Sequence, residues 1–207
     1  FVEVGTITPL KQYGNPKPRV FRLVEDEALI NRLGFNNHGA EIVKDRIKRN
    51  KKLGLLGINI GPNKDSSDRL NDYLIGLKTF YDDADYITVN ISSPNTENLR
   101  TFHEGDKLQD LLKSIMEEKK NLNSNIPIAV KVSPDISKDQ VSQISEILLE
   151  HEIKAIIVSN TSEATRDKLG NIQRHQKGGL SGKPIEEKSN ILINEFYKLL
   201  KGKIKII

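Results

Sequence analysis

Residues 53–91 read LGLLGINIGPNKDSSDRLNDYLIGLKTFYDDADYITVNI, two short apolar runs separated by an amphipathic stretch. The runs Leu53–Ile60 and Tyr86–Ile91 lack strict polar–apolar alternation, which is typical of strands buried on both faces. Between them, Asp68–Tyr81 repeats its apolar residues at the i, i+3, i+4 and i+7 spacing of a helix. The stretch therefore predicts a strand, a helix and a second strand.

The same alternation continues outward in both directions. Further strands are predicted at Ile126–Val132, Ala155–Val158 and Ile204–Ile207, with another in Val2–Thr8. Helices are predicted over Lys107–Glu118, over Gln140–His151, where Ser137 and Gln140 form a capping-box signal, and after Pro184.

Regular alternation of strands and helices predicts an α/β fold with a parallel sheet. Its closed form is the (β/α)8 TIM barrel, and its open alternative is a doubly wound sheet. No Gly-x-Gly-x-x-Gly follows any predicted strand, which disfavours the open form. A barrel needs eight strands and the chain stops inside an apolar run, so we expect residues 1–207 to be one barrel domain present as an incomplete central fragment.

Composition excludes several classes of function. The chain has no cysteine, and its four histidines lack metal-ligand spacing, so we expect no disulfide and no metal site. The net charge is +4, and the densest basic cluster, Lys44–Lys52, alternates with apolar residues as an exposed helix face does; an anionic partner or membrane surface is the alternative. Aromatic residues make up 5% and tryptophan is absent, so we expect no nucleic-acid partner.

Two predicted connections are long for a compact domain. They are Ser92–Asp106 and Ser162–Lys183, and the second is polar and ends in a glycine-rich string. Connections of this length are more often functional loops than spacers.

The predicted strands share a polar residue near their carboxyl ends. These residues are Asn59, Asn90, Lys131 and the run Ser159–Thr161. Because the carboxyl ends of parallel barrel strands open onto one face, this pattern predicts a binding site, although turns also favour asparagine. Amide side chains both donate and accept hydrogen bonds and so suit a planar heterocycle. The absence of an acid or histidine leaves two alternatives, an unusual base or a lysine-dependent reaction such as a Schiff-base aldolase using Lys131.

Six short strings carry a resemblance to a known family, following a first match at residues 4–9, VGTITP. They read INRLGFNN at 30–37, GINIG at 57–61, NISSPNT at 90–96, VKVSPD at 130–135, SNT at 159–161 and GGLSG at 178–182. In this order and spacing, they resemble dihydroorotate dehydrogenases over nearly the whole chain. A different FMN barrel acting on a pyrimidine is the nearest alternative.

The resemblance implies oxidation of (S)-dihydroorotate to orotate, with hydride transfer to FMN, in the biosynthesis of pyrimidines. The position of the catalytic base matches Ser93, and Thr96 and Phe35 are implied to flank its proton route. A serine there, rather than a cysteine, resembles the class that passes electrons to a quinone, whereas the soluble class is the alternative. That class implies a peripheral membrane protein, on the cytoplasmic side of a bacterial cell membrane or on the inner mitochondrial membrane.

The resemblance also assigns binding roles. Substrate binding is implied for Asn31, Asn90, Asn95, Asn160 and Thr161, with the backbone of Arg32, Leu33, Gly34 and Phe35 closing around the ring. Flavin binding is implied for Thr6, Asn59, Asn90, Lys131, Ser159 and Gly182. Arg22 matches a position near the quinone tunnel.

One motif departs from the family pattern. The family usually has Gly-Lys-Asn-Lys after the Asn59 turn, whereas this chain has Gly61-Pro62-Asn63-Lys64, which puts a role for that lysine in doubt. We also expect the first barrel strand with its substrate-contacting lysine, the strands that grip the FMN phosphate, and the membrane-docking helices to lie outside these residues.

Overall fold

A parallel sheet forms the centre of the structure, a computed structural model that describes residues 1–50, 54–95, 99–163 and 166–207. Six strands pair in the order β1, β4, β5, β6, β7 and β9, with every neighbour parallel. Their bounds are β1 Val2–Ile7, β4 Leu56–Ile60, β5 Tyr86–Asn90, β6 Ile128–Val132, β7 Ala155–Val158 and β9 Lys205–Ile206. A doubly wound sheet has a point at which the strand order reverses. Within the described residues this sheet has no such point.

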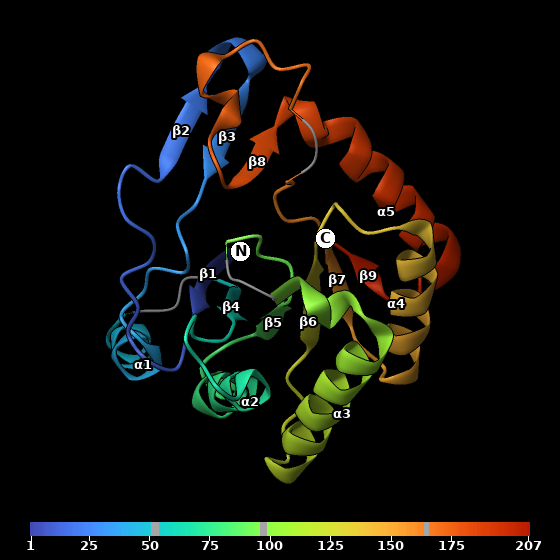
Figure 1. Cartoon of the computed structure of the whole chain (residues 1–207). Coiled ribbons are helices and arrows are strands. Elements are labelled where there is room, and N and C mark those ends of the chain that lie inside the picture. Colours follow the sequence, from blue (N-terminus) through green and yellow to red (C-terminus); the bar gives the residue numbers. More distant parts are fainter. Residues whose placement is uncertain (51–53, 96–98, 164–165) are drawn as a thin grey trace.

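Five helices of the described part of the chain cover the outside of this sheet (Figure 1). They are α1 Ala40–Arg49, α2 Arg69–Phe80, α3 Gly105–Asn121, α4 Lys138–Glu150 and α5 Glu186–Leu200. Strands that advance in one direction, with helices on one side only, form part of a (β/α)8 barrel. The predicted fold class is confirmed.

Local signals explain where two of these helices begin. The side chain of Asp68 accepts a hydrogen bond from the backbone N–H of Asn71 at the start of α2. Ser137 and Gln140 form both hydrogen bonds of the predicted capping box before α4. Such a cap stabilises a helix by about 1 kcal/mol. Pro184 does not open α5 directly, because it lies in a short 3-10 turn, η4 (Lys183–Ile185).

One hydrophobic core lies between the sheet and the helices. The inward residues of the neighbouring strands, such as Ile87 and Val130, are fully buried, and so is the apolar stripe of α3, formed by Leu108, Leu111, Leu112 and Ile115. Each side chain of this size contributes roughly 1.5–3 kcal/mol through its burial. The polar strand ends therefore rest on a rigid support.

A second, antiparallel sheet was not predicted. It consists of β2 Val20–Leu23, β3 Ala28–Asn31 and β8 Gly179–Gly182, and it has its own cluster of buried residues, which includes Leu23, Ile30 and Leu180. Figure 1 shows it beyond one end of the barrel strands, with β8 beside the start of α5. The 3-10 turn η1 (Val24–Asp26) joins its first two strands.

The two long connections contain more structure than predicted. The connection from Ser162 to Lys183 includes the 3-10 turn η3 (Ile172–His175) and all of β8. The connection from Ser92 to Asp106 includes the 3-10 turn η2 (Leu99–His103), and α3 already begins at Gly105. Both long connections are therefore partly structured.

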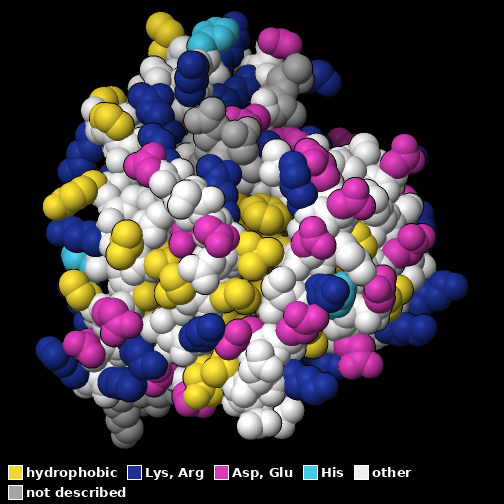
Figure 2. Space-filling view, turned by 60° about the horizontal axis from the view of Figure 1, so that its bottom comes forward, with side chains coloured by type: hydrophobic (Ala, Val, Ile, Leu, Met, Phe, Trp, Pro, Cys, Tyr) yellow, Lys and Arg dark blue, Asp and Glu magenta, His cyan; other side chains and the backbone are white. Residues whose placement is uncertain are grey.

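The surface mixes charges of both signs. Figure 2 shows basic and acidic side chains interspersed over one face, with apolar side chains between them. Lys44 forms an ion pair with Asp83, and Arg49 forms one with Asp45. In the part of the chain that the structure describes, every helix is too short or too polar to cross a membrane.

Candidate functional site

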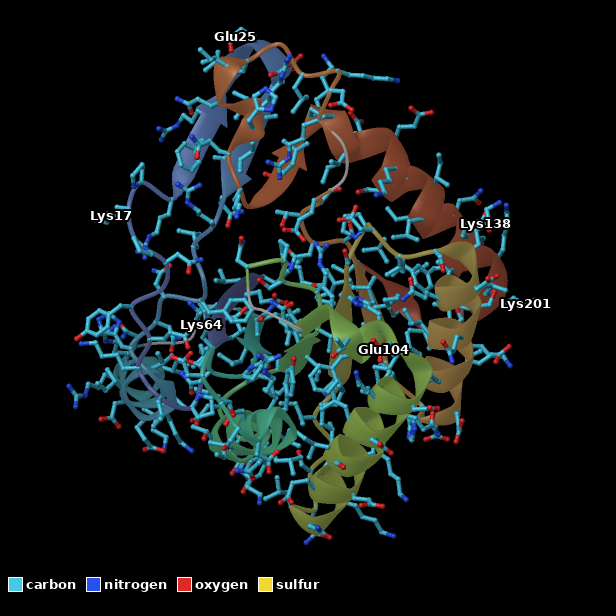
Figure 3. All side chains as sticks on the ribbon, viewed as in Figure 1. Lys17, Glu25, Lys64, Glu104, Lys138 and Lys201 are labelled. Atoms are coloured by element: carbon cyan, nitrogen blue, oxygen red, sulfur yellow. The ribbon has the colours of Figure 1, made fainter. Side chains whose placement is uncertain are left out.

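The carboxyl ends of the barrel strands open onto a polar cavity of about 490 Å³, on the side that faces β3. Figure 3 shows side chains from the strand ends and from the small sheet extending into this region. The cavity is lined by Glu3, Gly5, Thr6, Asn31, Leu33, Gly34, Phe35, Asn36, Asn59, Asn90, Ser93, Pro94, Asn95, Lys131, Asn160 and Thr161. Its volume lies within the roughly 300–1,000 Å³ of small-molecule sites.

A second cavity, of about 430 Å³, lies between α1 and the outer side of β1. Its lining is mostly apolar and includes Phe1, Val43 and Leu55, but none of the predicted site residues. The polar cavity, which gathers amides and a cation from successive strands, is therefore the candidate site.

Most of the predicted site residues line this cavity, three do not, and a fourth lies outside the described residues. Arg32 turns its guanidinium onto Gln176 and over the ring of Phe21. Ser159 contacts the hydroxyl of Ser189 on α5. The other two are described in the next paragraph.

Gly182 lies in β8, with φ at +102°, and a Cβ there would come within 2.4 Å of the carbonyl oxygen of Glu27. The small sheet itself thus requires this glycine. Thr96 lies outside the described residues. The roles predicted for all four residues stay predictions.

Asn90 is held by hydrogen bonds on both sides of its amide. Its Oδ1 accepts from the backbone N–H and the hydroxyl of Ser92, at 3.2 and 3.0 Å. Asn160 Nδ2 donates to the same Ser92 hydroxyl at 2.9 Å. Two of the predicted substrate amides, from β5 and from the turn after β7, are thus joined through one buried serine.

The hydrogen-bond chain continues across the strands to Glu3. Asn90 Nδ2 donates to Thr6 Oγ1 at 2.8 Å, and Thr6 Oγ1 donates to Asn59 Oδ1 at 2.7 Å. Asn59 Nδ2 then donates to Glu3 Oε1 at 2.9 Å, and Thr88 donates to the other carboxylate oxygen at 2.8 Å. A carboxylate only accepts hydrogen bonds, so Glu3 determines the orientation of both amides in the chain.

Sequence reasoning missed Glu3. The available signal was a single acid inside an apolar strand, between Val2 and Val4. Burial, followed by the nearby Glu3 carboxylate, raises the pKa of Tyr86 to about 12. This tyrosine occupies the space beside Gly57, where any Cβ would meet its ring.

Ser93 lies at the cavity wall and is 5% exposed. Its Oγ accepts a hydrogen bond from the backbone N–H of Asn95 at 3.2 Å. The side chain of Asn95 donates to the backbone carbonyl of Asn31 at 3.2 Å, so the Ser93 turn is attached to the end of β3. Its hydroxyl is therefore held in place and shielded from bulk water.

Lys131 contributes the cation of the cavity. Its ammonium group makes no hydrogen bond or ion pair with any residue that the structure describes. An unpaired ammonium group in a partly buried cavity favours an anionic or electron-rich ligand atom. Lys131 is therefore the residue best suited to stabilise negative charge in this site.

The motif Gly61-Pro62-Asn63-Lys64, which differs from the family pattern, has a structural role. Asn63 Nδ2 donates to the backbone carbonyl of Leu10 at 2.9 Å and to Gln12 Oε1 at 3.1 Å. Gln12 in turn donates to the carbonyl of Gly34 at 2.8 Å. The asparagine of the motif thus fixes the loop that closes one side of the cavity, and the proline does not disturb it.

Comparisons with known proteins agree on one family. The family model described as "Dihydroorotate dehydrogenase" matches residues 1–207. The chain is similar to "Dihydroorotate dehydrogenase (quinone)" of Bartonella tribocorum, with 47% identity over all of this chain and 59% of that protein. It is equally similar to the protein of that name from Pasteurella multocida, at 47% identity and 63% of its length.

The solved structures give the same result. The chain matches a crystal structure of DHODH from Eimeria tenella in complex with ferulenol, with a TM-score of 0.94 and 35% identity. That match covers 99% of this chain and 61% of the other. The chain therefore spans about six-tenths of the length of the relatives that it matches.

Proposed function

The chain belongs to the dihydroorotate dehydrogenase family, and from this premise we propose that the whole protein oxidises (S)-dihydroorotate to orotate. Electrons pass through FMN to a quinone, and the reaction serves pyrimidine biosynthesis. The "(quinone)" in the names of the relatives supports this class rather than the soluble one. Residues 1–207 belong to the FMN-binding barrel domain in this proposal.

The convergence of amides and one cation in a single cavity carries the proposal. Orotate is a planar ring with alternating carbonyl and N–H groups, which amides can match donor to acceptor. Asn90 and Asn160 present such amides from two strand ends, and Asn31 and Asn95 close the opposite side. We assign substrate binding to these residues, to Thr161 and to the loop Arg32–Phe35.

The residues fit a flavin beside the substrate. Thr6, Asn59 and Asn90 offer hydroxyl and amide groups on the strand side of the cavity, and Lys131 offers an unpaired cation there. We assign the flavin to these residues, together with Ser159 and Gly182. Bound FMN supplies a hydride acceptor, and a cation beside its ring stabilises the reduced, anionic form.

We assign the proton transfer to Ser93, with Phe35 and Thr96 flanking the route. A serine hydroxyl is a weak base, so it needs a pocket without water and a fixed position. The near-complete burial of Ser93 and its hydrogen bond to the Asn95 backbone meet both needs. A Schiff-base reaction at Lys131 gains no support, because it leaves the amides and Ser93 without a role.

Membrane contact belongs to the same proposal. Quinones reside in membranes, so the enzyme docks on a membrane surface through segments outside these residues. In a bacterium this is the cytoplasmic side of the cell membrane, and in a eukaryote it is the inner mitochondrial membrane. We place Arg22, on β2, near the path of the quinone.

A visible absorption spectrum of the full-length protein tests the proposal. We expect a bound-flavin spectrum that bleaches on anaerobic addition of dihydroorotate and recovers with a quinone, but not with a nicotinamide or fumarate. A flavin that stays oxidised would reject the substrate while keeping the cofactor. A folded protein without flavin would reject the proposal, and borohydride trapping at Lys131 would then test the aldolase alternative.

A further inference from the structure

We propose that Arg100 and Asp135 form a positioning pair that holds the Ser93 loop in register with the Asn160–Thr161 turn. The inference rests on the proposed function, because it concerns the base and the substrate amides of that reaction. Neither residue lines the cavity. Their contacts instead lie directly behind its wall.

The guanidinium of Arg100 contacts both loops at once. Its Nε donates to the backbone carbonyl of Ser92 at 3.2 Å, directly before the proposed base. Its Nη2 donates to the backbone carbonyl of Thr161 at 3.0 Å. Its Nη1 lies 3.1 Å from Asp135 and 3.3 Å from Glu163. Only the planar fork of an arginine provides donors in these directions together.

Asp135 binds Arg100 and also the residues that follow Thr161. It lies after β6, in the string that matched the family at 130–135, and it accepts from the hydroxyl of Ser162 at 2.6 Å and the backbone N–H of Glu163 at 2.7 Å. Lys188 on α5 donates to it as well. Burial acts to raise the pKa of the Asp135 carboxyl, but hydrogen bonds, above all that from Lys188, hold this pKa below its usual range. Asp135 therefore stays charged and ties three loops together.

His103 fixes the backbone of Arg100. Its Nδ1 lies 2.9 Å from the Arg100 carbonyl oxygen, and its Nε2 accepts from the backbone N–H of Ser133 at 3.2 Å. Burial lowers the pKa of His103 to about 4, so the ring is neutral at pH 7 with its proton on Nδ1. The turn that carries Arg100 is thus attached to the end of β6. This turn directly precedes α3, and the labelled Glu104 in Figure 3 marks the start of that helix.

These contacts link the ends of β5, β6 and β7 to one another. The Ser92–Asn160 hydrogen bond joins the loop after β5 to the loop after β7 on the side of the cavity. Arg100 joins the same two loops on the side away from the cavity. A displacement of about 1 Å between a base and its substrate can slow a reaction roughly 100-fold. The pair therefore acts on the rate of proton and hydride transfer, through the position of Ser93.

The test uses the full-length, FMN-loaded protein with Arg100→Ala and Arg100→Lys, and with the exposed Arg49→Ala as a matched control. Reduction of the flavin by dihydroorotate is followed by anaerobic stopped flow, and FMN content is measured beside it. We expect Arg100→Ala to slow reduction about 100-fold with FMN content unchanged. Added guanidinium ion should restore part of the rate, and Arg100→Lys should remain slow because a single ammonium cannot reach both carbonyls. Arg49→Ala should match the wild type.

The alternative outcomes are distinct. Wild-type rates in both Arg100 variants would overturn the inference, and so would a loss of activity that only tracks a loss of FMN. If Arg100→Ala does not fold, Asp135→Asn provides the second variant, with the same expected slowing and the same readout. A wild-type protein whose bound flavin dihydroorotate cannot bleach would refute the proposed function itself, and the inference with it.

Discussion

Replacing Ser93 by alanine should lower the rate of flavin reduction far more than it lowers the stability of the fold. Among the residues that the structure describes, the hydroxyl makes one hydrogen bond, accepted from the Asn95 backbone, so its loss should lower the free energy of unfolding by only about 1 kcal/mol. As a general base, the same hydroxyl should contribute a factor of about 10²–10⁴ to the rate of flavin reduction. This factor corresponds to about 2.7–5.4 kcal/mol of transition-state stabilisation.

The assay is anaerobic flavin reduction by dihydroorotate in the full-length protein, with FMN content and urea unfolding measured on the same samples. Ser93→Cys serves as the companion variant, because a thiol keeps an ionisable group at the position. Its rate should rise with pH as the thiol, with an ordinary pKa of about 8.5, loses its proton. Wild-type rates in Ser93→Ala would refute the assignment of the base.

Three further predictions follow from the hydrogen bonds of the site. Asn160→Ala should weaken orotate binding about 2- to 10-fold in a titration of the flavin spectrum and leave FMN bound, because one hydrogen bond between neutral groups contributes about 0.5–1.5 kcal/mol. Tyr73→Phe removes a buried donor 2.7 Å from the Asn90 carbonyl and should cost about 1–2 kcal/mol in urea unfolding; an unchanged midpoint would contradict this. His103, with its pKa at about 4 against 6.5 when unfolded, binds its proton more readily in the unfolded chain. The free energy of unfolding should therefore fall by about 3 kcal/mol as the pH drops from 6.5 toward 4. Urea unfolding at several pH values measures this fall, and His103→Gln should remove it.

Periodicity was sufficient to predict the barrel portion. The strand Ala155–Val158 was predicted to the residue, and the others differ by a few residues at their ends, because buried apolar runs extend into the turns that flank them. The capping signal at Ser137 was correct because both of its hydrogen bonds are local. The small sheet escaped prediction for the opposite reason: β8 is GLSG, a sequence without strand propensity, which is held in place by pairing with distant Ala28–Asn31.

In the candidate site, too, some residues could be predicted from the sequence and others could not. Asn59, Asn90, Lys131 and Asn160 were found because strand ends of a parallel barrel meet on one face, and the structure brings all four to one cavity. Arg100 could not have been found this way. Its contacts join loops that follow three different strands, and nothing in its local sequence indicates them.

The pairing of β3 with β8 has a consequence for synthesis on the ribosome. Leu29 and Ser181, in contact across the small sheet, are 152 positions apart. At roughly 5–20 residues per second, translation takes about 8–30 s to cover that distance. Until then β3 has only β2 as a partner, and an isolated two-stranded hairpin is marginally stable. The loop Arg32–Phe35 is therefore synthesised long before the strand that anchors it, and its position over the cavity becomes fixed only after β8 has been made and has paired with β3.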